Sequence, residues 1–229
     1  MLSAFLQQGG WLLIPALATG IVNWIAVARA QKRVEYVVKP GTLILVIIAA
    51  LLLMRGAPDE RLALFFVLGL CFSLAGDVFL MLPGERFFIP GLISFFIAHV
   101  FYIIGLNPTL PPLGSVIVMI VVAALGVMLY TRIAASLRQK GEQAMRVPVG
   151  AYATILSLML FSAWATLFRP DWSAAARFTA ILGATLFFAS DSMLAWNKFV
   201  APSHALRVGV MVTYHLAQFA LAATIALAV

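Results

Sequence analysis

The sequence predicts an all-α, polytopic membrane protein with eight transmembrane helices in one domain, residues 1–229. Two observations lead to this fold class. Hydrophobic residues make up 64% of the chain and charged residues only 10%, which is far less charge than a soluble domain carries. The apolar residues also form runs close to the roughly 20 residues that cross the hydrocarbon core. In that core backbone groups must pair within their own segment, so runs of this length are expected to be helices.

Eight apolar runs follow one another along the chain, and short loops separate them. The predicted spans are 11–28, 38–54, 62–82, 87–105, 113–131, 148–168, 176–197 and 205–228. Apart from basic residues near their ends, the only charged side chains in these runs are Asp77 and Asp191. Because the loops are short, no separate soluble domain is expected.

The positions of Lys and Arg predict how the spans are oriented. Of the 15 basic residues, eleven lie in or beside the loops after the first, third, fifth and seventh spans. This bias predicts that those loops are cytoplasmic and that both termini lie outside a plasma (inner) membrane. It also accounts for most of the net charge of +7, so we expect membrane lipids as partners and no nucleic acid.

The second and third spans each carry a charged residue near the predicted cytoplasmic side. In the second, Pro40 suits a first helical turn, and Lys39 can extend its ammonium toward the inner headgroups. In the third, Asp77 is costly inside a membrane, and such an acid normally faces the bundle interior or a wet cavity. Helical spacing puts Asp77 on one arc with small residues that permit close helix contact. They are Gly69, Ser73 and Gly76.

The seventh span repeats this arrangement around Asp191, whose face also carries Ser190 and Asn197. Both acid-bearing spans run inward in the predicted orientation, so the two carboxyl groups are expected at one depth, in the cytoplasmic half. The strings "GDVFLM" (76–81) and "SDSMLA" (190–195) are alike, and each precedes a span with a histidine. This echo predicts a parallel 4+4 internal repeat, related by an axis along the membrane normal.

Spans four, six and eight add further polar side chains that are expected to face the interior. They are Ser94, His99, Tyr102, Tyr152, Tyr214, His215 and Gln218. Each also has a structural interpretation as a hydrogen-bonded packing residue, and Lys39 also has one as a topology signal alone. The acids and histidines lack the close HxxxH or ExxH spacing of metal sites in helical bundles, so we expect no metal.

Six strings, in this order along the chain, resemble the YhhN-like lysoplasmalogenase family of membrane proteins. They are "VKP", "SLAGDVFLML", "FIPGLISFFIAHVFY", "VPVGAYATILSLM", "FFASDSMLAWNKF" and "TYHLAQ". The resemblance implies an eight-span hydrolase without a cofactor, which cleaves the vinyl ether of lysoplasmalogens to a fatty aldehyde and a glycerophospho-alcohol. It implies that Asp77 and Asp191 are catalytic. The substrate-binding residues that it implies are Lys39, Ser94, His99, Tyr102, Tyr152, Asn197, Tyr214 and Gln218.

Two buried carboxyl groups suit this reaction. A neutral carboxylic acid can protonate the β-carbon of a vinyl ether, and a carboxylate can stabilise the oxocarbenium ion and activate water, as paired acids do in glycosidases. A close pair in a low-dielectric site shares one proton near neutral pH. Which acid is the donor stays open, and we favour Asp191. Lys39, Arg86 and Lys198 are the expected anchors of the substrate's phosphate.

Two other classes of function stay open on the residues alone. Intramembrane acids and a histidine are equally what a proton-coupled transporter needs. A non-catalytic lipid-binding membrane protein is the third class. The sequence does not indicate the oligomeric state or the preferred headgroup and chain.

Overall fold

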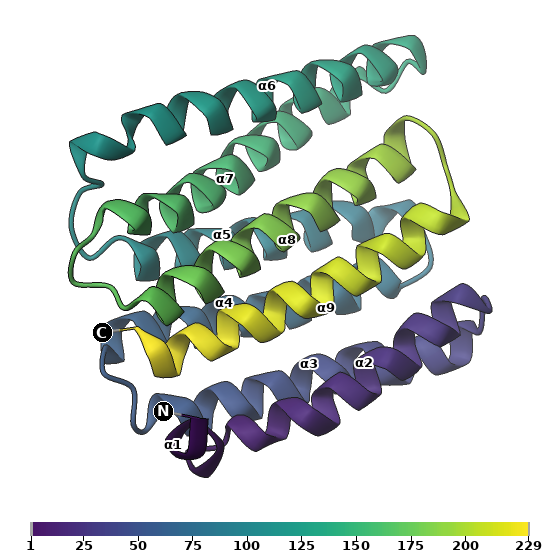
Figure 1. Ribbon diagram of the computed structural model, residues 1–229. Coiled ribbons are helices and arrows are strands. Elements are labelled where there is room, and N and C mark those ends of the chain that lie inside the picture. Colours follow the sequence, from purple (N-terminus) through teal and green to yellow (C-terminus); the bar gives the residue numbers. More distant parts are fainter. Residues whose placement is uncertain (1, 229) are drawn as a thin grey trace.

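The computed structural model describes residues 2–228, with side chains from Phe5 to Ala228. Every regular element in this range is a helix, as predicted. Eight of the helices are long and apolar enough to cross a membrane, and they lie side by side in one bundle (Figure 1). The prediction of a multi-pass, eight-helix membrane protein is therefore confirmed. The single domain and the internal repeat stay predictions, and Met1 and Val229 lie outside the described residues.

The helices follow the predicted order, with a short additional helix at the start. They are α1 (Leu2–Gln7), α2 (Leu13–Ala28), α3 (Lys32–Met54), α4 (Glu60–Met81), α5 (Phe88–Leu106), α6 (Val116–Gln139), α7 (Arg146–Ala165), α8 (Ala174–Phe199) and α9 (His204–Leu227). Single 3-10 turns precede α2, α5, α6 and α7 and follow α7. The N- and C-terminal ends of the described chain lie at the same end of the bundle (Figure 1).

The structure corrects the start of the second span. The prediction began at residue 38, whereas α3 begins at Lys32, so Pro40 lies inside the helix and not in its first turn. The charged residues Glu35 and Lys39 lie within the membrane-spanning helix because they face inward, where they are only 8% and 5% exposed. These two residues are four apart, so they share one face of α3.

The fifth predicted span was too short at its C-terminal end. Helix α6 continues to Gln139 instead of ending at residue 131. Its last turns bury Ile133 and Leu137 in one apolar cluster with Phe199. Ser136 and Lys140 both donate hydrogen bonds to the Phe199 carbonyl, at 2.6 and 2.8 Å. These contacts to the end of α8 keep the extension helical.

Glycines allow α4 and α5 to pack closely. A Cβ atom at Gly69 would lie 2.5 Å from the Tyr102 ring, and one at Gly76 would lie 2.6 Å from the Phe95 ring. Both rings are buried. The predicted small-residue arc of α4 therefore faces the interior, and it carries the buried Asp77 with it.

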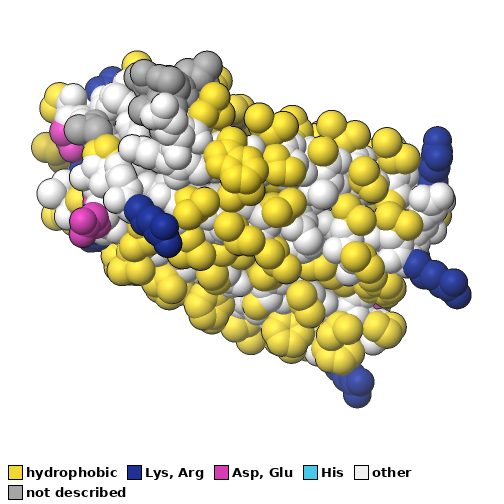
Figure 2. All heavy atoms as spheres, turned by 90° about the horizontal axis from the view of Figure 1, so that it is seen from below, with side chains coloured by type: hydrophobic (Ala, Val, Ile, Leu, Met, Phe, Trp, Pro, Cys, Tyr) yellow, Lys and Arg dark blue, Asp and Glu magenta, His cyan; other side chains and the backbone are white. Residues whose placement is uncertain are grey.

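The surface of the bundle is divided into bands. Figure 2 shows one face with apolar side chains across its middle and with Lys and Arg gathered at the ends. Helix α6 contributes several exposed large apolar side chains, which are 54–67% exposed. Among them are Ile117, Ile120, Val121 and Val127. An apolar belt between charged ends matches a bilayer between two aqueous phases.

Candidate active site

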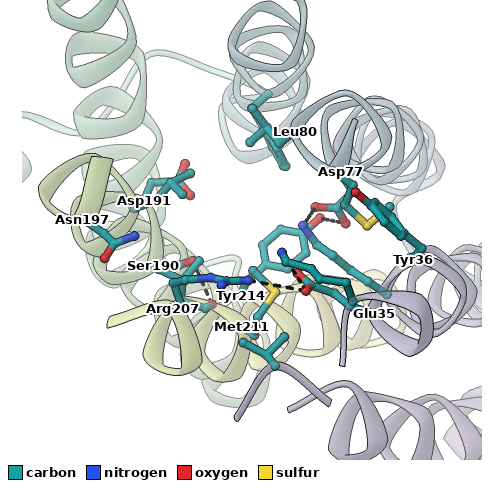
Figure 3. Close-up of a pocket in the computed structure, with 17 residues that line it drawn as sticks. Glu35, Tyr36, Asp77, Leu80, Ser190, Asp191, Asn197, Arg207, Met211 and Tyr214 are labelled. Atoms are coloured by element: carbon teal, nitrogen blue, oxygen red, sulfur yellow. Dashed lines mark hydrogen bonds and ion pairs between the residues drawn. The ribbon is translucent and has the colours of Figure 1, made fainter. Parts of the chain in front are cut away.

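A cavity of about 210 Å³ lies among α3, α4, α8 and α9. Its lining includes residues beside the α2–α3 and α8–α9 loops, so it lies toward the end of the bundle opposite the termini (Figure 1). Asp77 and Asp191 both line it, and Figure 3 shows them on different sides of the cavity. The two predicted acids therefore share one cavity, although no hydrogen bond joins them among the described side chains.

Asp77 is held by two partners on two other helices. Its Oδ1 lies 2.9 Å from Nζ of Lys39 on α3. Its Oδ2 accepts a hydrogen bond of 2.8 Å from the hydroxyl of Tyr214 on α9. Asp77 is 1% exposed and Lys39 is 5% exposed, so this ion pair is buried. The structure thereby corrects the expectation for Lys39, whose ammonium turns inward to Asp77 instead of reaching toward the headgroups.

Asp191 has a different environment. Its Oδ2 accepts a hydrogen bond from the hydroxyl of Tyr152 on α7. None of the ion pairs among the described side chains includes Asp191. The adjacent Ser190 donates to the Val210 carbonyl at 3.1 Å and ties this part of α8 to α9. The two acids are thus both buried and hydrogen-bonded, but only Asp77 has a cation beside it.

A layer of aromatic rings supports the two tyrosines. The ring of Phe187 meets Tyr214 edge-on, with centroids 5.6 Å apart, and it meets His99 at 4.7 Å. His99 also packs edge-on against Tyr152, with a centroid distance of 5.5 Å. Its Nδ1 lies against the Phe95 carbonyl, and the ring does not line the cavity. His99 therefore contacts the site through Tyr152. The described side chains contain no group of three or more His, Cys, Asp and Glu arranged to hold a metal ion.

The other predicted site residues fall into two groups. Asn197 lines the cavity, and its Oδ1 accepts a hydrogen bond of 2.6 Å from the Ser203 amide in the α8–α9 loop. Ser94 bonds a carbonyl of its own helix, and Tyr102 donates to Gln218 at 3.0 Å. Ser94, Tyr102 and Gln218 are buried but do not line the cavity. Substrate contact stays a prediction for every residue of the set.

Sequence reasoning missed the charged group at the outer part of the cavity. Glu35 lies 3.1 Å from Nζ of Lys32 and 3.4 Å from Nη2 of Arg207, and all three residues line the cavity. Two predicted phosphate anchors, Lys198 and Arg86, do not line this cavity. Lys198 pairs with the exposed Glu85, and Arg86 lies over the Phe87 ring. The four-residue spacing of Glu35 and Lys39 could have indicated this cluster, because it puts both residues on one helix face. The predicted span began at residue 38 and therefore left Glu35 outside the helix.

A second, apolar space lies beside Asp191. This slot of about 40 Å³ shares Leu80, Phe95, Asp191 and Leu194 with the cavity. Its remaining lining comes from α5, α7 and α8. The residues are Phe88, Leu92, Val149, Tyr152, Ala195, Lys198 and Phe199. Asp191 therefore borders both a polar cavity and a small apolar slot.

Comparison with known proteins gives a consistent set of relatives. The human lysoplasmalogenase TMEM86A is 33% identical over 161 residues, which are 67% of this chain and 62% of that protein. The mouse lysoplasmalogenase TMEM86B is 36% identical over 156 residues, covering 65% of this chain and 58% of that protein. A lysoplasmalogenase of Mycobacterium tuberculosis is 29% identical over 173 residues, covering 72% and 62%.

The matched part spans less than two thirds of the length of these relatives. No solved structure matches the chain. The model of the YhhN family matches residues 34–225, a range that contains both aspartates, Glu35 and Arg207. With most of its length matched in this way, the chain belongs to the YhhN family.

Proposed function

We propose that the protein is a membrane hydrolase that cleaves the vinyl ether bond of lysoplasmalogens. The observation that carries this proposal is the pair of buried carboxyl groups in one cavity, only one of which has a cation beside it. The names of the relatives support the substrate class, since each is a lysoplasmalogenase. The products are a fatty aldehyde and a glycerophospho-alcohol.

The contacts of the two acids support different roles for them. An ammonium 2.9 Å from Asp77 favours its ionised form, and the Tyr214 hydroxyl adds a hydrogen bond to the same carboxylate. Asp191 has no such cation, so burial favours its neutral form. Asp191 is accordingly the proton donor, and Asp77 is the carboxylate that stabilises positive charge and activates water.

The reaction proceeds in three balanced steps. Asp191 gives its proton to the β-carbon of the vinyl ether, which leaves an oxocarbenium ion beside the Asp77 carboxylate. Water adds to the cationic carbon and loses a proton to Asp77, so a hemiacetal forms. The hemiacetal collapses to the aldehyde and the alcohol when Asp77 gives its proton to the leaving glycerol oxygen and Asp191 takes the proton of the hemiacetal hydroxyl. Both acids are then back in their starting forms. A fixed anion near the developing cation lowers the energy of the transition state.

The apolar slot offers a place for the start of the hydrocarbon chain. A vinyl ether is the junction between the chain and the glycerol, and Asp191 lies at the junction between slot and cavity. A substrate lying across this junction brings its double bond to the donor. The first carbons of the chain then lie in the slot among Leu92, Val149 and Phe199, and the glycerol and phosphate occupy the cavity.

We place the protein in the plasma (inner) membrane with the cavity toward the cytoplasm, on the charge bias of its loops. Both termini then lie outside. A reporter enzyme fused after Val229 should be active only in the form that works outside the cytoplasm. Activity of a cytoplasm-dependent reporter at this position would contradict the orientation.

Asp77→Asn and Asp191→Asn should each lower kcat/KM for aldehyde release by about 10²–10⁴-fold, because each removes a group that gives or takes a proton. The double variant should be hardly worse than either single one, since the two act as a unit. The measurement is aldehyde release from detergent-purified protein, where no membrane gradient exists to drive a transporter.

Glu85→Gln is the matched control, because Glu85 is exposed and lines neither the cavity nor the slot. It should retain wild-type turnover. Thermal unfolding separates lost chemistry from lost folding. A folded aspartate variant with near wild-type turnover would disprove the two-acid mechanism.

Lys39→Met should lower kcat far more than it raises KM. Without the ammonium, the buried Asp77 takes up a proton and no longer stabilises a cation. An anchor of the phosphate would behave in the opposite way, because a contact made equally with substrate and transition state changes KM alone. Steady-state kinetics over a range of lysoplasmalogen concentrations distinguish these results. A raised KM with unchanged kcat would return Lys39 to a headgroup role.

A further inference from the structure

The outer part of the cavity carries one acid between two bases. Oε2 of Glu35 contacts both Lys32 and Arg207 (Figure 3 shows the pair with Arg207). The Glu35 side chain is 10% exposed, whereas those of Arg207 and Lys32 are 35% and 56% exposed. The acid is therefore held in place, and the bases remain accessible to a ligand that enters the cavity.

The two bases have unused hydrogen-bonding capacity. A guanidinium has five N–H donors in a planar fork that matches phosphate oxygens, and an ammonium has three. In the described part of the chain, Glu35 is the one side chain that pairs with Arg207. It is also the one side chain that pairs with Lys32. Most of the donors on both side chains are thus free for an anion.

The spacing between this cluster and the acids fits a glycerol phosphate. Glu35 and Lys39 lie one turn apart on the same face of α3, about 6 Å along the helix axis. Because Lys39 pairs with Asp77, the Lys39 ammonium and the Asp77 carboxylate lie at the same depth in the bundle. In a lysophospholipid, five single bonds separate the ether oxygen from phosphorus and span about 6 Å when extended. A vinyl ether beside the acids therefore places its phosphate near Glu35, Lys32 and Arg207.

We propose that Arg207 and Lys32 bind the phosphate of the substrate and that Glu35 binds the ammonium group of its headgroup. This assignment rests on the proposed function and adds a zwitterionic headgroup to it. The ring of Tyr36 lines the same cavity and offers an aromatic face to an ammonium. Glu35 is thus the residue that distinguishes a headgroup with an amine from a bare phosphate.

The test measures binding, so that it does not depend on turnover. Three saturated ether lipids with the same chain lack the vinyl double bond and cannot be cleaved: an alkylglycerol, its 3-phosphate and its phosphoethanolamine ester. Calorimetry with the purified full chain in detergent gives an affinity for each. We expect the phosphoethanolamine lipid to bind tightest and the alkylglycerol weakest.

Arg207→Gln should weaken binding of both phosphate lipids at least 10-fold and leave the alkylglycerol unchanged. Glu35→Gln should weaken only the phosphoethanolamine lipid and should leave the bare phosphate lipid as tight or tighter. The matched controls are Arg138→Gln and Glu85→Gln, exposed residues at the same end that do not line the cavity. Both should bind all three lipids as the wild type does.

The proposal is overturned if Arg207→Gln binds the three lipids with wild-type affinities, or if Glu35→Gln keeps the wild-type preference for the amine. Free phosphoethanolamine separates a lipid site from a site for soluble phosphates. It should bind much more weakly than the lipid, because it lacks the chain, and equal affinity would also overturn the proposal. If the protein binds the three lipids as expected but releases no aldehyde from a lysoplasmalogen, the proposed function is wrong and the headgroup site still stands.

Discussion

The buried ion pair between Lys39 and Asp77 is the interaction on which the rest of the site depends. Each charge is costly inside a membrane protein, and removing either partner leaves the other uncompensated. Their contact at 2.9 Å, together with the hydrogen bond from Tyr214, joins α3, α4 and α9 at one depth. The Lys39 ammonium also balances the negative charge of Asp77, whereas Asp191 has no cation beside it. The difference between the two acids is therefore a consequence of how the helices pack.

The surroundings of the acids match an amphiphile from end to end. Charged side chains line the outer cavity, carboxyl groups lie at its inner part, and an apolar slot begins beside Asp191. A lysophospholipid has the same order of polarity along its length.

The sequence predicted what depends on local periodicity. The eight spans and the buried arc around Asp77 follow from apolar run length and from the helical repeat, and the structure confirms both. The partners of Lys39 and Asp191 could not be predicted, because each contact depends on how two separate helices rotate and pack against each other. The start of α3 was misplaced because Glu35 and Lys39 look like loop charges until their inward partners are known. That error also hid the cluster of Glu35 with Arg207.

Proton transfer to carbon is the central claim, and a reaction in D₂O tests it most directly. The aldehyde is reduced to the alcohol as it forms, so that later exchange adds no label, and the product is analysed by mass spectrometry and NMR. The account predicts one deuterium at the carbon next to the former carbonyl, in a single configuration, because Asp191 delivers it from one side. A product without deuterium at that carbon, or with both configurations in equal amounts, would contradict protonation by a positioned carboxyl group.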